Sequence, residues 1–141
     1  MKTHISLNVR NVEASVAFYS KMLGIEPFKV RPGYAKFDVA NPPLNLALNE
    51  VADVKQGGAL SHLGLQVTST DEVLAFREKW LEAGLVTRDE MKTDCCYAVQ
   101  DKTWVRDPDG NSWEAFVVLA DSQQVVASSC CATDAASCCV A

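Results

Sequence analysis

The sequence predicts an α+β protein in which two βαβββ modules form a cupped mixed sheet around a cleft. Two observations predict this fold: a pattern of strand followed by helix begins at each of the two histidines, and strand-like pieces follow each helix. The chain of 141 residues is long enough for one domain with a core. We expect a single domain over residues 1–120, with modules at about 1–50 and 60–120, and a flexible cysteine-rich tail over residues 121–141.

The repeat is visible when HISLNVRNVEASVAFYSKML, starting at His4, is set against HLGLQVTSTDEVLAFREKWL, starting at His62. Each copy begins with residues that alternate between polar and apolar, which predicts a strand, and continues with apolar residues at helical spacing. A glycine, a common residue just past a helix end, follows each predicted helix. The identical pairs are His4/His62, Leu7/Leu65, Val9/Val67, Ala17/Ala75, Phe18/Phe76, Lys21/Lys79 and Leu23/Leu81.

Three further strands are expected after each helix. They cover roughly Pro27–Val30, Tyr34–Val39 and Leu44–Leu48 in the first module, and Cys96–Val99, Lys102–Arg106 and Trp113–Leu119 in the second. The run DPDGN at 107–111 has the composition of a tight turn between the last two strands. The stretch 49–61, which contains two adjacent glycines, is expected to link the modules.

Composition and charge exclude several classes of partner. The net charge of −5 argues against nucleic acid, because binding to phosphates needs clustered Lys and Arg. No apolar stretch is long enough to cross a bilayer, which predicts no membrane partner. MKTHISLNV lacks the continuous apolar segment of a signal peptide, so we expect a cytoplasmic protein with reduced cysteines.

The two histidines and one glutamate are candidate metal ligands and catalytic residues. His4 and His62 start equivalent strands and lie on the polar face of each, while Glu114 lies near the start of an apolar strand. Burying a lone carboxylate is costly, and a metal ion would remove that cost. Two imidazoles and one carboxylate with open positions suit non-haem Fe(II) oxygenases, although Fe, Mn, Ni, Co and Zn all stay possible. Alternatively, each histidine forms an ordinary hydrogen bond and Glu114 lies exposed at a rim.

No carboxylate occurs in the first module where a counterpart of Glu114 would fall, at residues 44–48. The sequence therefore predicts a three-ligand site with room for substrate or dioxygen.

All six cysteines occur as adjacent pairs, at 95–96, 130–131 and 138–139. A disulfide between neighbours is unfavourable, because their Cα atoms lie about 3.8 Å apart whereas bonded pairs usually span roughly 4.4–6.8 Å. Cys95 and Cys96 are therefore expected to present two free sulfurs, which are soft ligands for a soft centre. Both sulfurs can reach one atom only if residues 93–97 form a loop or an irregular strand start.

HISLNV, FYSKMLGIEP and the late VRDPDGNSWEAF resemble the vicinal-oxygen-chelate superfamily of glyoxalases, extradiol dioxygenases and bleomycin- or fosfomycin-resistance proteins. The resemblance covers roughly residues 1–120. TDCCYAVQDKTWVRDPDGNSWEAF, together with the cysteine pairs of the tail, more specifically resembles the organoarsenical carbon–arsenic lyases, a family that overlaps with cadmium-induced proteins.

This resemblance implies a site and a reaction. His4, His62 and Glu114 match the family's iron ligands, and Cys95 and Cys96 match its arsenic-binding thiols. The implied reaction is the oxidative, Fe(II)- and O2-dependent cleavage of the carbon–arsenic bond, converting methylarsenite to arsenite, with related activity on trivalent aromatic arsenicals. The partner is then a small-molecule trivalent organoarsenical, and the protein is a monomer or a homodimer. Ni, Co, Mn or Zn can replace iron in purified protein.

Other functions remain open. The cysteine pairs could sequester cadmium or arsenic, or the chain could be another metalloenzyme of the superfamily, either a glyoxalase-like isomerase or a ring-cleaving dioxygenase. Lys102, Trp104 and Arg106 share one face of a strand, where they could border the cleft, although a solvated edge is the expected arrangement. No role is assigned to Cys130, Cys131, Cys138 or Cys139.

Overall fold

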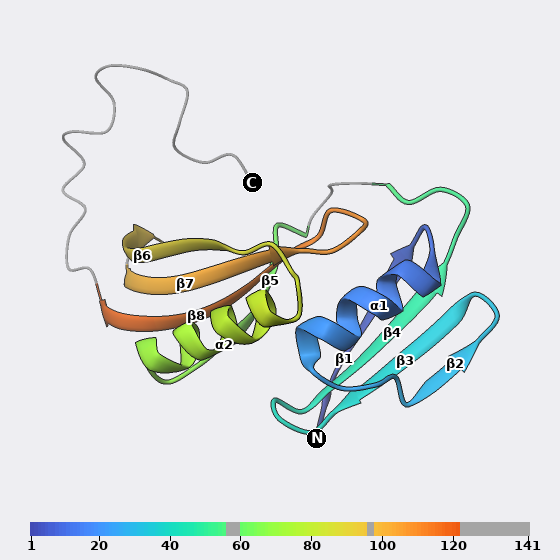
Figure 1. Ribbon diagram of the computed structural model, residues 1–141, viewed down its shortest axis with the longest axis horizontal. Helices are drawn as coiled ribbons and strands as arrows, with labels where there is room; N and C mark the ends of the chain where they lie inside the picture. Colours follow the sequence, from blue (N-terminus) through green and yellow to red (C-terminus); the bar gives the residue numbers. More distant parts are fainter. Residues whose placement is uncertain (56–59, 96–97, 122–141) are drawn as a thin grey trace, which may run out of the picture.

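The computed structural model of the protein describes residues 1–55, 60–95 and 98–121 (Figure 1). The first module consists of β1 (Thr3–Val9), α1 (Val12–Leu23), β2 (Lys29–Arg31), β3 (Tyr34–Val39) and β4 (Leu44–Glu50). The second consists of β5 (Leu63–Gln66), α2 (Thr70–Glu82), β6 (Arg88–Cys95), β7 (Ala98–Arg106) and β8 (Ser112–Asp121). The order of elements confirms the predicted α+β class with two βαβββ modules.

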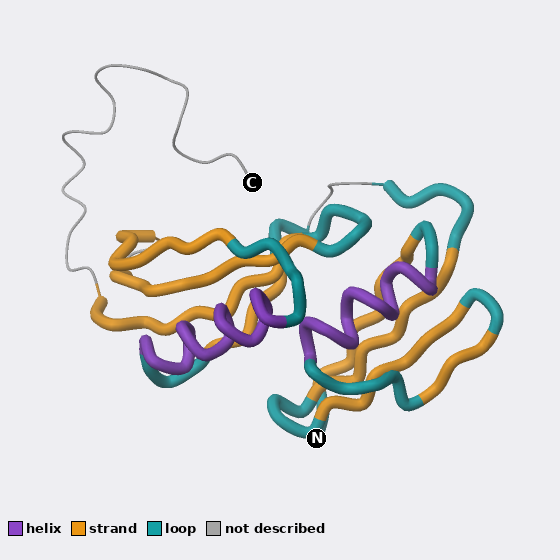
Figure 2. Tube along the Cα trace, viewed as in Figure 1, coloured by secondary structure: helices purple, strands orange, loops and turns teal. Residues whose placement is uncertain are grey.

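Each module forms its own four-stranded mixed sheet. The strand orders are β1-β4-β3-β2 and β5-β8-β7-β6, and in each sheet the first strand pairs in parallel with the last. Each helix lies along its own sheet (Figure 2). Because side chains alternate along a strand, one face of each sheet packs in the core and the other stays open. Along β1, for example, Leu7 and Val9 are buried whereas His4, Ser6 and Asn8 are exposed.

The helices begin and end where local chemistry satisfies the backbone. The side chain of Asn11 accepts from the amide of Ala14, and that of Ser69 accepts from the amide of Glu72. At the end of α1, Gly24 adopts a φ of 69°, a left-handed conformation that glycine takes without strain. The apolar stripes then place Tyr19 and Trp80 in the core.

The two modules are joined by contacts between α1, α2 and the 107–111 turn. The Trp80 indole donates to the carbonyl of Met22 at 2.9 Å, and these two residues occupy equivalent positions in the repeat. The two helices meet near the middle of the molecule (Figure 1). Tyr19 reaches the second module, where it bonds to Asp107 and receives a 3.1 Å hydrogen bond from Trp113.

The predicted strands of the second module were partly wrong. The structure places a strand at Arg88–Cys95, and it shows one long strand, Ala98–Arg106, where two short ones were expected. The sequence of β6, RDEMKTDC, is largely charged and lacks alternating apolar residues, so its pattern gave no strand signal. A register shift between Glu90 and Thr93, where Lys92 has a positive φ of 51°, further breaks the alternation.

No helix among residues 1–55, 60–95 and 98–121 is long and apolar enough to cross a membrane.

Candidate metal site

The open face of the second sheet brings His62 and Glu114 together. His62 immediately precedes β5, and Glu114 lies on the adjacent strand β8, where it is paired with Gly64. The His62 Nε2 atom lies 3.5 Å from Glu114 Oε1. This distance is too long for a good hydrogen bond, but it suits two atoms that each lie about 2.1 Å from one shared metal ion.

Gly64 makes the space that the carboxylate occupies. A Cβ atom at this position would lie 3.0 Å from Glu114 Cγ, 3.3 Å from Oε1 and 3.3 Å from the ring of Phe116. The distance to Cγ is tighter than most contacts that a Cβ atom makes, so a larger residue would require the Glu114 side chain to shift. The absence of a side chain at Gly64 thus places Glu114 beside His62.

Glu114 is buried and incompletely satisfied. It is 5% exposed, and its Oε2 atom has no hydrogen-bond partner. The ammonium of Lys102 lies 3.4 Å from Oε2, close enough for an ion pair but without the geometry of a hydrogen bond. Lys102 therefore faces Oε2, whereas Oε1 faces the imidazole of His62, and a cation on the Oε1 side would lie between a nitrogen ligand and a buried carboxylate. The imidazole and carboxylate at this position therefore fit a metal ion.

Trp104 forms the wall of the site next to His62. Its ring lies edge-to-face with the imidazole at 5.2 Å between centroids, and the Lys102 ammonium lies 5.4 Å from the same indole. The indole Nε1 is buried without a hydrogen-bond partner. The site thus contains one acceptor, Glu114 Oε2, and one donor, Trp104 Nε1, that are buried without a hydrogen bond.

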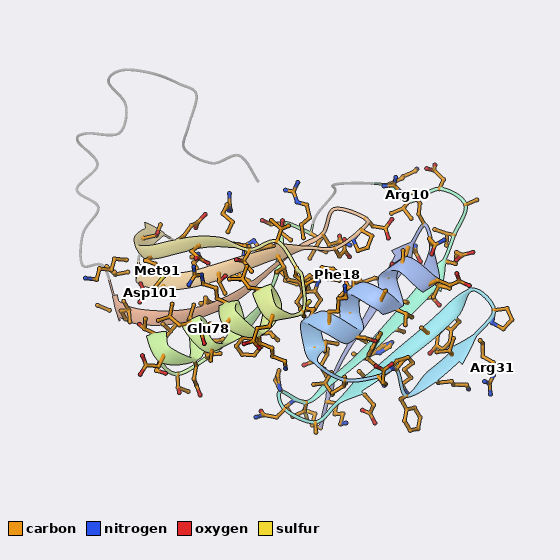
Figure 3. All side chains as sticks on the ribbon, viewed as in Figure 1. Arg10, Phe18, Arg31, Glu78, Met91 and Asp101 are labelled. Carbon is orange, nitrogen blue, oxygen red and sulfur yellow. The ribbon has the colours of Figure 1, made fainter. Side chains whose placement is uncertain are left out.

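Lys102 and Trp104 do not form the solvated edge that was expected. The preceding residue Asp101, labelled in Figure 3, accepts a 2.6 Å hydrogen bond from Thr70 of α2, so it points to the helix side of the sheet. Because side chains alternate along β7, Lys102 lies on the face of the sheet opposite the helix. Lys102 is buried there by its neighbours, whereas Arg106 is exposed. A lysine twelve residues before its carboxylate gives no sequence signal, because the contact depends on the pairing of β7 with β8.

His4 lies in the other sheet. Its Nδ1 atom is 3.1 Å from the carbonyl oxygen of Asn45, on the neighbouring strand β4. Among the described residues, no group of three or more His, Cys, Asp or Glu side chains is placed to hold a metal ion. Within this part of the chain, the structure therefore brings together two of the three predicted ligands.

The pairing of strands identifies the counterpart of Glu114 in the first module. Gly64 pairs with Glu114, and Ser6, the repeat equivalent of Gly64, pairs with Ala47. Alanine cannot bind a metal, which agrees with the expected lack of a carboxylate on this strand.

The predicted thiol pair falls at the edge of the described residues. The backbone of Cys95 ends β6, opposite Ala98 of β7, whereas Cys96 lies outside the described residues. Cys130, Cys131, Cys138 and Cys139 also lie outside them.

The paired βαβββ modules and the histidine and carboxylate on an open sheet face define the class of protein. Residues 3–115 match the Glyoxalase/Bleomycin resistance protein/Dioxygenase superfamily, and the chain belongs to this superfamily. A glyoxalase/bleomycin resistance protein/dioxygenase from Alicyclobacillus acidocaldarius shares the fold with a TM-score of 0.70 at 14% identity, covering 85% of this chain and 92% of that one.

Relatives at higher identity narrow the comparison. The chain is 51% identical over 114 residues to a trivalent organoarsenical cleaving enzyme of Bacillus sp. (strain MD1), covering 80% of this chain and 70% of the relative. It is 44% identical to the enzyme of the same name from Thermomonospora curvata, covering 92% and 87%. It is 48% identical to the cadmium-induced protein CadI of Mycobacterium tuberculosis, covering 86% and 79%. These relatives confirm the resemblance seen in the sequence.

Proposed function

We propose that the protein cleaves the carbon–arsenic bond of trivalent organoarsenicals in an Fe(II)- and O2-dependent reaction. The observation that carries the proposal is the buried carboxylate of Glu114, whose Oε1 atom lies 3.5 Å from the Nε2 atom of the exposed His62, in a chain similar to organoarsenical cleaving enzymes. The substrates are methylarsenite and trivalent aromatic arsenicals. The protein acts in the cytoplasm.

His4, His62 and Glu114 are the proposed ligands of the iron and the catalytic residues. When bound, Fe(II) supplies the ability to activate dioxygen for oxidation of the carbon–arsenic bond. For methylarsenite, one dioxygen molecule balances the reaction: one oxygen atom becomes the third hydroxyl oxygen of arsenite and the other becomes the carbonyl oxygen of formaldehyde. The methyl carbon loses the four electrons that dioxygen gains.

Cys95 and Cys96 bind the substrate. Trivalent arsenic makes three bonds and spends one on carbon, so an adjacent pair of thiolates satisfies the other two. This captures a methylated or arylated arsenical in preference to one that needs a third thiol. Holding the arsenical beside the metal ligands lowers the activation barrier through proximity. For well-oriented reactants this effect amounts to roughly several kcal/mol.

Two copies of the chain complete the metal site, each giving His4 to the His62 and Glu114 of the other. Supporting this arrangement, His4 lies in a different sheet from the other two ligands, and β1 and β5 are both outer strands of their sheets. A two-fold dimer exchanges the same surfaces in both directions, so it creates two equal sites. With one Glu114 per chain, each site receives one carboxylate.

Aerobic turnover of methylarsenite by the Fe(II)-loaded protein, followed by arsenic speciation, tests the proposal. Catalytic release of arsenite that stops without oxygen, and in Glu114→Gln, is the expected result. Tight binding of the arsenical by wild-type protein with no arsenite released would instead favour thiol-based sequestration. Turnover of a catechol in place of methylarsenite would assign a ring-cleaving dioxygenase, and of a thiol-conjugated aldehyde a glyoxalase-like isomerase.

A further inference from the structure

Lys102 is a buried ammonium that the proposed reaction does not use. Its side chain is 6% exposed, whereas lysine almost always keeps its charged end in water. A lysine is buried in this way when its charge has a partner, because an unpaired ammonium in the protein interior is costly. The burial of Lys102 therefore implies that its Nζ atom has a partner nearby.

Two groups face the ammonium: the carboxylate of Glu114 at 3.4 Å and the indole of Trp104 at 5.4 Å. A second cation, the guanidinium of Arg88, lies 5.6 Å from the same indole and is also paired with Glu90 at 3.0 Å. Lys102 is thus the cation paired with Glu114, and Arg88 is paired elsewhere.

The two oxygens of Glu114 face different cationic or basic groups. Oε1 faces His62 Nε2 at 3.5 Å, which is the side on which a shared metal ion fits. Oε2 faces Lys102. An ammonium on Oε2 repels a divalent ion from that oxygen, while it leaves Oε1 available.

We propose that Lys102 is a positioning residue that restricts Glu114 to binding the metal through Oε1 alone and holds the carboxylate in place when no metal is bound. This inference rests on the proposed metal site, and it adds a residue that limits how the Glu114 carboxylate binds the metal ion. A carboxylate that uses one oxygen leaves a coordination position that a two-oxygen ligand would fill. Lys102 thereby preserves open positions at the cost of weaker metal binding.

Anaerobic titration of the full-length protein with Co(II), followed by visible absorption, tests this role. Co(II) is used because its absorption bands weaken as coordination number rises, so one titration reports affinity and ligand count. In Lys102→Met, a side chain of similar length without charge, we expect Co(II) to bind about tenfold more tightly, the scale of removing a neighbouring positive charge. The molar absorptivity should fall as Oε2 joins the coordination.

Lys102→Arg keeps the charge and should retain the affinity and spectrum of the wild type, whereas a purely packing role would not be rescued in this way. Lys21→Met, an exposed lysine of α1, is the matched control and should change neither. Thermal unfolding of each variant checks that it is folded.

Unchanged or weaker Co(II) binding in Lys102→Met, with normal binding by the wild type, overturns the role of Lys102 and leaves the metal site intact. Wild-type protein that binds no Co(II), or binding that survives in both His62→Ala and Glu114→Gln, overturns the metal site and with it the role of Lys102.

Discussion

The hydroxyl of Tyr19 donates a 2.6 Å hydrogen bond to Asp107, joining the first helix to a turn 88 residues away. Asp107 also accepts from the amides of Asp109 and Asn111, so the same carboxylate shapes the turn and binds the other module. Asp109 in turn accepts from the backbone amide of Arg10, labelled in Figure 3, and forms an ion pair with its side chain. The DPDGN run is therefore a joint between modules as well as a turn.

Tyr19→Phe should lower the free energy of unfolding by about 1–3 kcal/mol, because it leaves a buried carboxylate short of a donor. Burial, together with the nearby charge of Asp107, raises the pKa of Tyr19 well above its usual value. The hydrogen bond thus stabilises the protein fully below the pKa of an unfolded tyrosine and is lost only as pH rises above it. Urea unfolding at pH 7 measures the change. Tyr34→Phe, on β3, is the control, and an equal loss in both variants would contradict the prediction.

Gly64→Ala should weaken Co(II) binding by roughly tenfold, because the new methyl group crowds the Glu114 side chain, which must shift to make room. Gln66→Ala, on the same face of β5, should leave the affinity unchanged. Titration of both folded variants provides the comparison. Equal affinities would show that the carboxylate need not occupy the space beside Gly64.

Mixing inactive His4→Ala with inactive His62→Ala should restore activity. In a mixed dimer, the intact His4 of one copy meets the intact His62 and Glu114 of the other, forming one complete site. Joint refolding at equal amounts should give about one quarter of wild-type activity, because half of the dimers are mixed and each has one good site in two. A site formed within one chain predicts no recovery, which would contradict the shared arrangement.

Cys95→Ser should reduce arsenical affinity roughly a hundredfold, since one thiolate loses the advantage of binding together with its neighbour. Iron content should remain near that of the wild type, because the proposed metal ligands are His4, His62 and Glu114. Binding of phenylarsenite by calorimetry, alongside metal analysis, separates the two effects. Normal turnover in this variant would remove Cys95 from substrate binding.

Glu72→Gln should lower the melting temperature at neutral pH. The backbone amide and the hydroxyl of Thr68 donate to the Glu72 carboxylate at 2.7 and 2.8 Å, which lowers the pKa of Glu72. Because the pKa of Glu72 is lower in the folded state than in the unfolded state, the ionised carboxylate stabilises the fold at pH values above the pKa of the unfolded state. This stabilisation is lost as the pH falls through the pKa of the folded state. The difference between variant and wild type should therefore disappear in acid. Melting curves from pH 7 to pH 3 test this, and a constant difference would contradict it.

The repeat and its histidines could be predicted because strand and helix periodicities are local properties of the sequence. His4 and His62 begin equivalent segments, and their exposed side chains follow from alternation alone. The burial of Lys102 could not be predicted in this way, because its partner is set by the register between β7 and β8. The bond from Tyr19 to Asp107 depends on how the modules pack.

Strand β6 could not be predicted from the sequence for a different reason. Its charged sequence has no apolar alternation, and it forms a strand because it pairs along β7. Backbone hydrogen bonding to a neighbour can thus override a weak local preference.

The presence of Ala47 where the second module has Glu114 bears on how such a chain evolves. Two identical modules would each carry an acid at this position, and either module could replace the other. Here the first half carries an imidazole and no acid at the equivalent position, whereas the second half carries both. A chain that doubled the first half would carry no carboxylate at this position, whereas the second half carries both residue types, so the proposed site depends on the second half for its acid.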